Sequence, residues 1–402
     1  MIHIFINALA ASAGGGLTYV RNVIPHVGVR RDVRTTLLLN ARLRGELPPC
    51  ANVVLIEREM PSNVINRIWF EQRTVAELIR LAGANVLLSA GNFALWSSPV
   101  PQILLSRNSL YTSRDFYRDL EARGDHRLWI DTHLKSAFAK WSIQVADRVV
   151  APSQAFAQEL QAWTGKPVAA IHHGFDYEAF VRDQSPLPTH LRQQIDSASA
   201  ALRLIFVSHY NYYRNFETLI RALPLIKRQV KPRNLRLFLT CKLAPGANPG
   251  AYRTDFAAAL IRDLALTDDV VELGAIPYNL LHHVYRAADI YVSPAYAESF
   301  AHPLVEAMSC GLPVVASDLA VHQEICGSAA LYFERFSPQQ LAERVVEVAE
   351  SAPLRRQLSQ AGVERSAAFS WKLHVDRIVQ VANELILERA DSRGVPSPLA
   401  AN

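Results

Sequence analysis

Short apolar runs alternate with helical patterns along nearly the whole chain, and this alternation limits the fold more than any other feature. Strands that regularly alternate with helices form parallel sheets covered by helices on both faces. In the first half of the chain we expect strands near residues 2–7, 35–40, 53–56, 86–89, 102–106, 148–151 and 168–171. In the second half we expect strands near residues 202–208, 235–240, 270–273, 288–292, 314–317 and 330–333. Two such sets favour two Rossmann-like α/β domains over one very large sheet.

A polar stretch with two prolines, residues 176–200, separates the two sets of strands. We therefore predict an N-terminal domain over residues 1–180 and a C-terminal domain over residues 200–373. The last residues, 391–402, are polar and are predicted to form a flexible tail. Ligands of such sheets bind beyond the carboxyl ends of the strands, so two domains with facing sheets predict a binding cleft between them.

The composition excludes several classes of protein. Half of the residues are hydrophobic and 20% are charged, which suits a globular chain with sizeable cores. We find no apolar run long enough to span a membrane, and the N-terminal run is more typical of a buried strand than of a signal peptide. The four cysteines lack paired or metal-ligand spacing and suit a reducing compartment, so the cytoplasm is the expected location.

The most informative segment is 293–318, in which a strand, a loop, a helix and a second strand follow one another. Pro303 suits the first position of the helix, where a missing N–H costs little, and Gly311 suits its end. Glu298 lies on the loop and Glu306 on the helix. Free amides at a helix N-terminus bind anions such as phosphate, and neighbouring carboxylates can accept hydrogen bonds from sugar hydroxyls. The segment therefore predicts a site for a phosphate attached to a polyol, as in a nucleotide sugar.

This segment resembles the donor site of the retaining glycosyltransferases of family 4, which have the GT-B fold. Their signature reads E-S-F-G-L-P-L-L-E-A-M, and here it runs from Glu298 to Met308. Ala301 and His302 replace the common Gly-Leu pair, but both backbone amides are kept. The resemblance implies that Glu298 holds hydroxyls of the donor sugar and that Glu306 holds the ribose. It also implies donor contacts for the loop residues Ser299, Phe300, Ala301 and His302.

Residues 206–222 resemble a second family landmark, which usually reads V-G-R-x4-K-N. By position, Arg214 stands for the family's lysine and His209 for its arginine. The resemblance implies that both residues stabilise the departing diphosphate, Arg214 with a permanent charge. Because free histidine is mostly neutral at pH 7, His209 needs the bound diphosphate to favour its protonated form. The alternative is that His209 only fills the end of the strand.

The first half of the chain contains the residues predicted for the acceptor side. Gly14, Gly15 and Gly16 follow the first strand and precede a helical pattern, so the backbone there can approach a ligand closely. By resemblance Gly15 and Gly16 face the donor phosphate and Gly14 faces the acceptor; the alternative is a tight turn. After the fifth strand, Arg107 could pair with an acceptor phosphate and Asn108 with a sugar hydroxyl. The alternative there is a surface arginine and an asparagine that caps the loop.

Two more loops and the absence of a metal motif complete the predicted site. His173 stands at the end of the last strand of the first half, where we expect a cleft loop on the acceptor side. Gly274 precedes a predicted helix, and the resemblance implies that the backbone there reads the nucleobase. No D-x-D motif lies where a divalent cation would be needed. We therefore expect no metal or other cofactor, with Arg214 and helix termini balancing the diphosphate.

The formal net charge of +5 lies mostly in the first half, where residues 1–180 hold 19 Lys and Arg against 15 Asp and Glu. No nucleic-acid motif accompanies this charge, so nucleic acid is not an expected partner. A mildly basic surface without a partner and a peripheral contact with an anionic membrane are the two interpretations. Residues 63–82 predict an amphipathic helix rich in arginine and aromatic residues, which in relatives acting on lipid-linked acceptors faces the membrane. The alternative is a packed helix with a hydrated arginine face.

The resemblance implies a retaining hexosyltransferase that uses a UDP- or GDP-linked sugar and a glycan or lipid-linked acceptor, as in bacterial cell-envelope polysaccharide synthesis. It also implies that a last helix, near residues 374–390, packs back on the N-terminal domain. Two alternatives stay open. A GT-B sugar-nucleotide epimerase would need acid and base carboxylates in the N-terminal loops. A non-catalytic nucleotide-sugar-binding subunit of a polysaccharide assembly complex would fit the departures at His209 and Ala301.

Overall fold

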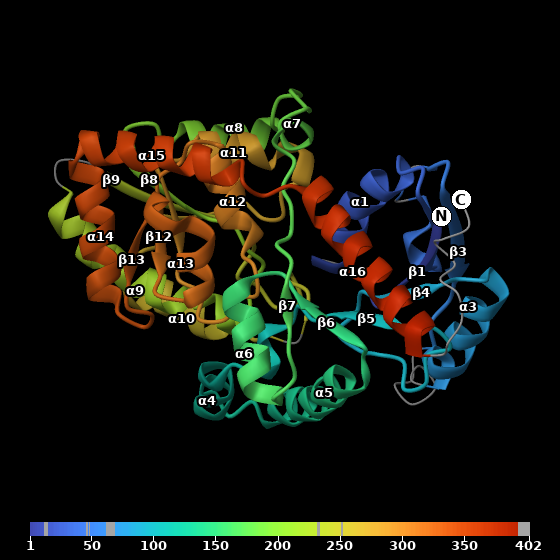
Figure 1. The fold of residues 1–402 in the computed structure, drawn as a ribbon. Coiled ribbons are helices and arrows are strands. Elements are labelled where there is room, and N and C mark those ends of the chain that lie inside the picture. Colours follow the sequence, from blue (N-terminus) through green and yellow to red (C-terminus); the bar gives the residue numbers. More distant parts are fainter. Residues whose placement is uncertain are drawn as a thin grey trace. The chain divides into compact units, whose positions relative to one another are not determined.

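The computed structural model describes residues 1–11, 15–45, 47, 49–61, 69–230, 234–250 and 252–392. The chain divides into two compact units (Figure 1). Unit 1 comprises residues 1–112, 130–174 and 370 onward, and unit 2 comprises residues 113–129 and 175–369. Residues 113–129 thus belong to unit 2 although they fall within the predicted N-terminal domain. The predicted domain boundaries stay a prediction, because units of contact need not be independently folding domains. Most of the predicted tail, 393–402, lies outside the described residues.

Unit 1 is built on a parallel sheet in the order β3-β2-β1-β4-β5-β6-β7. Its strands are β1 (Ile2–Ala8), β2 (Val33–Asn40), β3 (Val53–Arg58), β4 (Val86–Ser89), β5 (Gln102–Leu105), β6 (Arg148–Ala151) and β7 (Ala169–Ala170). In the register of the central strands, Ile4 of β1 pairs with Thr35 of β2 and with Val86 of β4. The central strands β4 and β5 are buried along their whole length, whereas the edge strand β3 is partly exposed. Burial on both faces explains why the central strands are continuous apolar runs in the sequence.

Unit 2 is built on a parallel sheet in the order β10-β9-β8-β11-β12-β13. Its strands are β8 (Ala201–Phe206), β9 (Asn234–Leu239), β10 (Val270–Glu272), β11 (Ile290–Ser293), β12 (Val314–Ser317) and β13 (Ala330–Phe333). Every strand predicted from the apolar runs is present at its predicted place. The predicted α/β class with two Rossmann-like parallel sheets is therefore confirmed.

Helices connect the strands of unit 1 and cover its sheet. They are α1 (Gly15–Gly28), η1 (Ala41–Leu43), the π-helix η2 (Glu71–Val75), α3 (Ala76–Ala82), η3 (Ser109–Tyr111), α5 (His126–Val145), α6 (Gln154–Thr164) and α16 (Trp371–Ser392). α5 begins in unit 2 and continues in unit 1. α16 packs against α1, and Trp371, Val375 and Ile378 join the core formed with β1. The last helix therefore completes the core of unit 1. Residues 63–68 of the predicted amphipathic helix lie outside the described residues.

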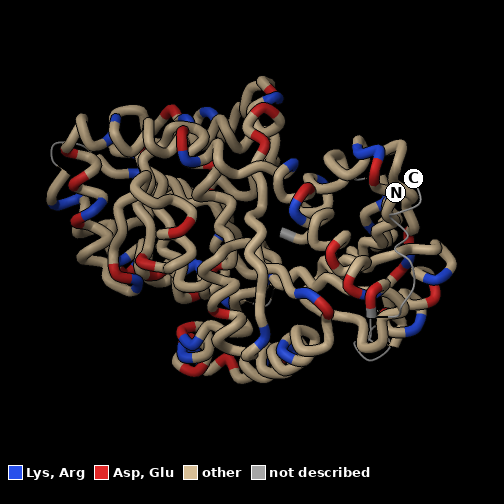
Figure 2. Tube along the Cα trace, in the orientation of Figure 1, with Lys and Arg blue, Asp and Glu red and all other residues tan. Residues whose placement is uncertain are grey.

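Unit 2 has a helix layer on each side of its sheet. Its helices are α4 (Arg114–Ala122), α7 (Tyr177–Phe180), α8 (Thr189–Asp196), η4 (Tyr212–Arg214), α9 (Phe216–Gln229), α10 (Asp255–Asp263), η5 (Tyr278–Leu280), α11 (Leu281–Arg286), α12 (His302–Ser309), α13 (Ala320–Cys326), η6 (Gly327–Ala329), α14 (Pro338–Glu350) and α15 (Ala352–Ser366). α9 packs against α14, and α12 packs against α15 (Figure 1). Basic and acidic residues are interspersed in both units (Figure 2).

Candidate active site

The strand order of unit 2 leaves a place for a ligand at the carboxyl ends of β8 and β11. The strand order reverses between these two strands, which pair in parallel through Ile290 and Leu204. At such a switch point the following loops leave in opposite directions and open a place for a ligand. The loop after β8 carries Arg214, and the loop after β11 carries Glu298. Strand adjacency therefore brings together two residues that are far apart in the chain.

Arg214 and Glu298 form an ion pair between Nη1 and Oε1, and both side chains are mostly buried. Asn215 reinforces the junction, because its Nδ2 donates a hydrogen bond to the carbonyl of Pro294 at 3.1 Å. Its backbone is left-handed, with a φ of 54°, at the residue before α9. The backbone N–H of Tyr296 also donates to the carbonyl of Tyr213 at 2.9 Å. These bonds hold the two loops as one structure, which suits a preorganised binding site.

Sequence reasoning assigned no role to Asn215, although it helps to join these loops. The available signal was an asparagine directly before a helical pattern, since asparagine is favoured at helix N-termini and tolerates the left-handed region. Its link to Pro294 could not be seen in the sequence, because it depends on the adjacency of two strands.

His209 lies in the same loop as Arg214. Partial burial and the neighbouring guanidinium of Arg214 lower the pKa of its imidazole below the ordinary value. The side chain is therefore neutral at pH 7 until an anion raises its pKa. Arg214 itself stacks over Tyr213, with 5.1 Å between its guanidinium carbon and the ring centre. The permanent positive charge of this loop lies on Arg214.

The entry into α12 has an unusual backbone. Ala301 precedes the helix with a φ of 66°, in the left-handed region that L-residues other than glycine and asparagine seldom adopt. The N–H of Leu304 donates to the carbonyl of Ala301 at 3.0 Å and starts the helix. Pro303 is the second residue of the helix rather than the first, and Gly311 follows the helix end with a φ of 69°. Glycine, the common residue at position 301 of the signature, would adopt this backbone without steric cost.

The loop residues before α12 differ in what they can offer a ligand. Phe300 is 2% exposed, and its ring packs edge-on against Phe369 at 5.4 Å between centres. The ring centre of His302 lies 4.8 Å from that of Phe300. Ser299 is partly buried. Phe300 can therefore reach a ligand only through its backbone, because its side chain belongs to the core.

Glu306 lies on α12 with only 5% of its surface exposed. Burial raises the pKa of its carboxyl to about 7, although hydrogen bonds from Tyr285 and Tyr278 act in the opposite direction. The hydroxyl of Tyr285 donates to Oε2 at 2.8 Å. Burial thus favours the neutral form of Glu306 much more than in an exposed carboxyl. Tyr285, on α11, fixes its orientation and was not singled out from the sequence, where it is one aromatic residue of a helical pattern.

Gly274 lies just beyond β10, at the same edge of the sheet as the loops that carry Arg214 and Glu298. Its φ of 82° lies in the left-handed region, where glycine is the usual residue. A Cβ added to Gly274 would lie 3.3 Å from Cε of Lys242. The position therefore tolerates a larger residue poorly.

In unit 1, Gly16 and Arg107 lie beside each other. A Cβ on Gly16, in the first turn of α1, would lie 3.0 Å from Cα of Ala11 and 3.7 Å from Nη2 of Arg107. Nη2 of Arg107 donates to the carbonyl of Ala90 at 2.6 Å. Burial lowers the pKa of Arg107 to about 10, so the guanidinium keeps its charge at neutral pH. The side chain is partly buried, and its role stays a prediction.

The other residues predicted for the acceptor side have mainly structural surroundings. Asn108 caps η3, since its Oδ1 accepts from the N–H of Leu110 at 3.1 Å, as in the loop-capping alternative. His173 is buried in an aromatic cluster, 5.4 Å from the ring of Tyr19 and 5.3 Å from that of Trp371. Gly15 begins α1, and Gly14 lies outside the described residues.

The described part of the chain contains no group of three or more His, Cys, Asp or Glu that could hold a metal ion. No helix within the described residues is long and apolar enough to cross a membrane.

Each half of the chain matches a known protein family. Residues 13–179 match the family described as Glycosyltransferase Family 4, and residues 189–365 match Glycosyl transferases group 1. This chain belongs to glycosyltransferase family 4. The first region contains the residues predicted for the acceptor side together with Gly15 and Gly16, and the second contains the other residues predicted for the donor.

Curated relatives of this family 4 member include D-inositol 3-phosphate glycosyltransferases. The one from Thermobispora bispora is 28% identical over 63% of this chain and 59% of its own length. The one from Streptosporangium roseum is 28% identical over 60% of this chain and 55% of its own length. The chain thus spans somewhat more than half the length of these curated relatives.

Solved structures with low sequence identity share the GT-B fold with this family 4 member. Sucrose-phosphate synthase from Thermosynechococcus elongatus has a TM-score of 0.75 at 18% identity, over 96% of this chain and all of the other. HepE from Anabaena in complex with UDP-glucose has a TM-score of 0.68 at 19% identity, over 95% of this chain and 99% of the other. WaaG, a glycosyltransferase involved in lipopolysaccharide biosynthesis, has a TM-score of 0.65 at 16% identity, over 95% and 99% of the two chains.

Proposed function

We propose that this protein transfers a hexose from a nucleoside diphosphate sugar, UDP- or GDP-linked, to a hydroxyl group with retention of the anomeric configuration. The observation that carries the proposal is the Arg214–Glu298 pair at the switch point of unit 2. A guanidinium suits a diphosphate, and a carboxylate suits the hydroxyls of a sugar. Membership of glycosyltransferase family 4 supports the same assignment.

Each donor residue has a proposed role. Glu298 accepts hydrogen bonds from hydroxyls of the donor sugar, and the buried Glu306 accepts them from the ribose. Arg214 and a protonated His209 hold the diphosphate. The donor then replaces Glu298 as the partner of Arg214, so binding exchanges one ion pair for another. Backbone contacts to the donor come from Gly15, Gly16, Gly274, Ser299, Phe300, Ala301 and His302.

The proposed reaction is a same-face displacement. The bond between the anomeric carbon and the diphosphate oxygen breaks, and the acceptor oxygen bonds to that carbon from the same face. The departing diphosphate oxygen takes the acceptor proton. The protein's contribution is orientation and charge stabilisation, supplied by Arg214 and the amides that lead into α12. No metal is assigned to these steps.

The acceptor is proposed to carry a phosphate, as lipid-linked glycans do. The partly buried guanidinium of Arg107 beside the first turn of α1 supports this class, because helix N-termini and arginine both suit anions. The names of the curated relatives, which specify an inositol phosphate, point to the same chemistry. Gly14, Asn108 and His173 keep their predicted roles on the acceptor side as part of this proposal.

A cytoplasmic enzyme that elongates lipid-linked envelope polysaccharides would work at the membrane surface, and α5 supports such a contact. Ile130, Leu134, Phe138 and Trp141 are exposed along one face of α5, at spacings of three and four residues. Trp141 stacks edge-on with the exposed Trp96 at 4.9 Å between ring centres. Tryptophan suits the polar–apolar boundary of a bilayer.

The membrane proposal is tested by sedimentation with phosphatidylglycerol vesicles. The double variant Phe138→Ser, Trp141→Ser should pellet less than the parent, whereas Leu373→Ser, a change at another exposed apolar residue, should pellet equally. Equal pelleting of all three proteins would contradict a role for α5.

The transfer proposal is tested first by melting temperatures measured with nucleoside diphosphates and their sugars, with and without EDTA. A ligand that binds the folded state raises the melting temperature, so one diphosphate should stand out and identify the base. EDTA should leave its effect unchanged.

Transfer from the identified donor is then compared in two variants. Glu298→Ala should lower the rate at least about a hundredfold. Glu347→Ala, which removes an exposed carboxylate from α14, should leave it unchanged. Full activity in Glu298→Ala would refute the assignment, and donor binding without transfer to any acceptor would favour the non-catalytic subunit.

A further inference from the structure

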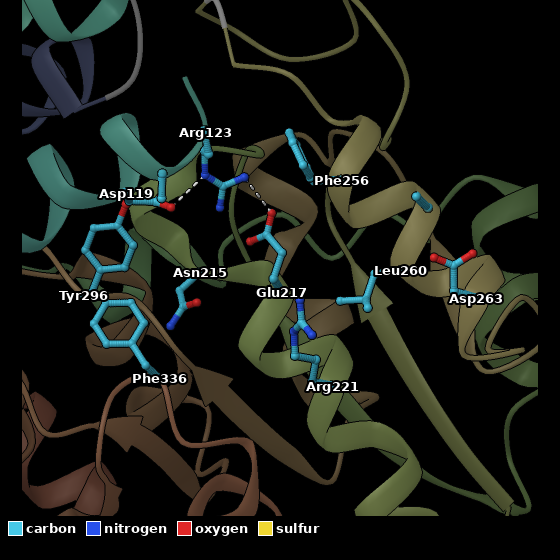
Figure 3. Close-up of a pocket in the computed structure, with 12 residues that line it drawn as sticks. Asp119, Arg123, Asn215, Glu217, Arg221, Phe256, Leu260, Asp263, Tyr296 and Phe336 are labelled. Carbon is cyan, nitrogen blue, oxygen red and sulfur yellow. Dashed lines mark hydrogen bonds and ion pairs between the residues drawn. The ribbon is translucent and has the colours of Figure 1, made fainter. Parts of the chain in front are cut away.

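A pocket of about 440 Å³ lies within unit 2, between α4, α9, α10 and the turn before α14 (Figure 3). This volume falls in the range of small-molecule sites. Arg214, Glu298 and Glu306 do not line it, so it is not explained by the proposed donor site.

Two phenylalanines at the pocket leave large parts of their rings in water. Phe336 is 47% exposed and Phe256 is 45% exposed. The ring of Phe336 lies 5.2 Å from that of Tyr296, with 36° between the planes (Figure 3). The guanidinium groups of Arg123 and Arg253 lie over the ring of Phe256, 5.6 and 5.7 Å from its centre, so Phe336 is the ring that offers a ligand the freer surface.

The backbone at Phe336 makes its exposure more informative. Its φ is 71°, in the left-handed region, where a bulky residue is a genuine outlier. The N–H of Ser337 donates to the carbonyl of Glu334 at 3.0 Å, and Phe336 is the third residue of this turn. Turns with a positive φ at that position normally have glycine there. A strained phenylalanine that remains half exposed points to a use for its ring beyond folding.

The polar lining contains a carboxylate oxygen without a partner. Oε1 of Glu217 accepts from Nη1 of Arg123 at 3.1 Å and from the hydroxyl of Tyr210 at 2.8 Å. Oε2 is buried, and no hydrogen bond reaches it within the described part of the chain. Arg123 is meanwhile held by Asp119 at 2.8 Å, as the dashed lines in Figure 3 show. Oε2 is closed to solvent and Arg123 is already engaged, so the charged groups of the lining that a ligand can reach are the exposed side chains of Asp263 and Arg221.

The balance of charge selects the class of ligand. The pocket is lined by the carboxylates of Asp119, Glu217 and Asp263 and by the guanidinium groups of Arg123 and Arg221. The excess of carboxylates disfavours a phosphate or another anion. A cation is also disfavoured, because the described residues form no metal-binding group and two of the carboxylates already pair with Arg123. A neutral polyol fits, since its hydroxyls can both donate to Asp263 and accept from Arg221 while its ring covers Phe336.

We propose that this pocket is a carbohydrate-binding site for neutral glycan chains, separate from the donor site. Sugar rings pack on Phe336, and their hydroxyls bond to Asp263 and Arg221. The identity of the bound chain as acceptor or product rests on the proposed transfer function. The binding itself does not, because none of the residues proposed to contact the donor lines the pocket, although Asn215 and Tyr296, which join the donor-site loops, do line it.

The test is binding of neutral gluco-, manno- and galacto-oligosaccharides of about six sugars, without donor, by calorimetry and saturation-transfer NMR. Phe336→Gly is the informative variant, because glycine relieves the positive φ and leaves the fold intact while the ring is lost. It should melt no lower than the parent and bind the glycan about tenfold more weakly, which corresponds to about 1.4 kcal/mol. Arg221→Met should also weaken binding.

A matched control is Ala265→Gly, which relieves another positive φ, of 53°, in unit 2 without touching the pocket. It should bind the glycan like the parent. The proposal is overturned if none of the oligosaccharides binds, or if Phe336→Gly and Arg221→Met bind as well as the parent. Loss of glycan binding with donor binding intact supports the new site. Loss of transfer in Glu298→Ala with glycan binding intact concerns only the proposed function.

Discussion

Replacing Glu306 by glutamine should stabilise the protein above neutral pH. The buried carboxyl has a pKa of about 7 in the folded state, against an ordinary value of 4.5. The folded state therefore binds its proton more tightly than the unfolded state does. As the pH rises from about 4.5 to about 7, the unfolded state loses this proton first, so the free energy of unfolding falls. Above that range the loss of unfolding free energy caused by the ionised Glu306 is constant, because the carboxyl is ionised in both states.

The magnitude follows from the two pKa values. Each unit of difference corresponds to about 1.4 kcal/mol, so the ionised Glu306 lowers the free energy of unfolding by about 3 kcal/mol at about pH 8. At about pH 5 the free energy of unfolding is lowered by less than about 1 kcal/mol. Glutamine removes the titration, keeps the volume and can still accept the hydrogen bond from Tyr285. The advantage of Glu306→Gln over the parent should therefore grow with pH.

The assay is urea unfolding of both proteins at several pH values between about 5 and about 8, followed by far-UV circular dichroism. Tryptophan fluorescence is less suitable, because of the six tryptophans only Trp129 lies in unit 2. Glu347→Gln, at an exposed carboxylate of α14, serves as the control and should show no trend. If Glu306→Gln is no more stable than the parent at about pH 8, the reasoning about its buried charge is wrong.

Three further predictions concern the backbone and the donor loop. Gly174→Ala should destabilise unit 1 by more than about 4 kcal/mol, measured by thermal unfolding, because a Cβ would lie 1.9 Å from the backbone nitrogen of Trp371. Ala301→Gly should stabilise the protein by about 1 kcal/mol, since glycine adopts the left-handed region freely; a lower melting temperature would contradict this. Binding of the nucleoside diphosphate, measured by calorimetry, should strengthen relative to His209→Gln as the pH falls from about 8 to about 6, because the lowered pKa of His209 must rise on binding. A constant ratio of the two affinities would exclude His209 as a phosphate contact.

The sequence was sufficient to predict the strands and the family signature. The strands of both sheets could be predicted because parallel strands that are buried on two faces are apolar runs in the sequence. These runs contrast with the polar segments around them. The loop and helix from Glu298 to Gly311 could be predicted because neighbouring residues determine where a helix begins and ends. The same locality made Asn108 recognisable as a loop cap.

Other features depend on residues that are distant in the chain. Ala301 and Phe336 adopt a positive φ that no local signal predicts, because neither residue type favours it. The raised pKa of Glu306 reflects burial and the position of Tyr285 on another helix. Nε of Arg107 proved to be buried, which its place in a loop did not indicate.

The sequence by itself therefore determined the α/β class, the order of strands and helices, and the presence of a family 4 donor segment, since periodicity and short-range motifs encode all three. Only the tertiary structure decided that Arg214 meets Glu298, that residues 113–129 join unit 2, and that Glu217 and Phe336 share a pocket. The physical reason is that strand order and packing bring together residues from separate segments, and burial then sets their charges and partners.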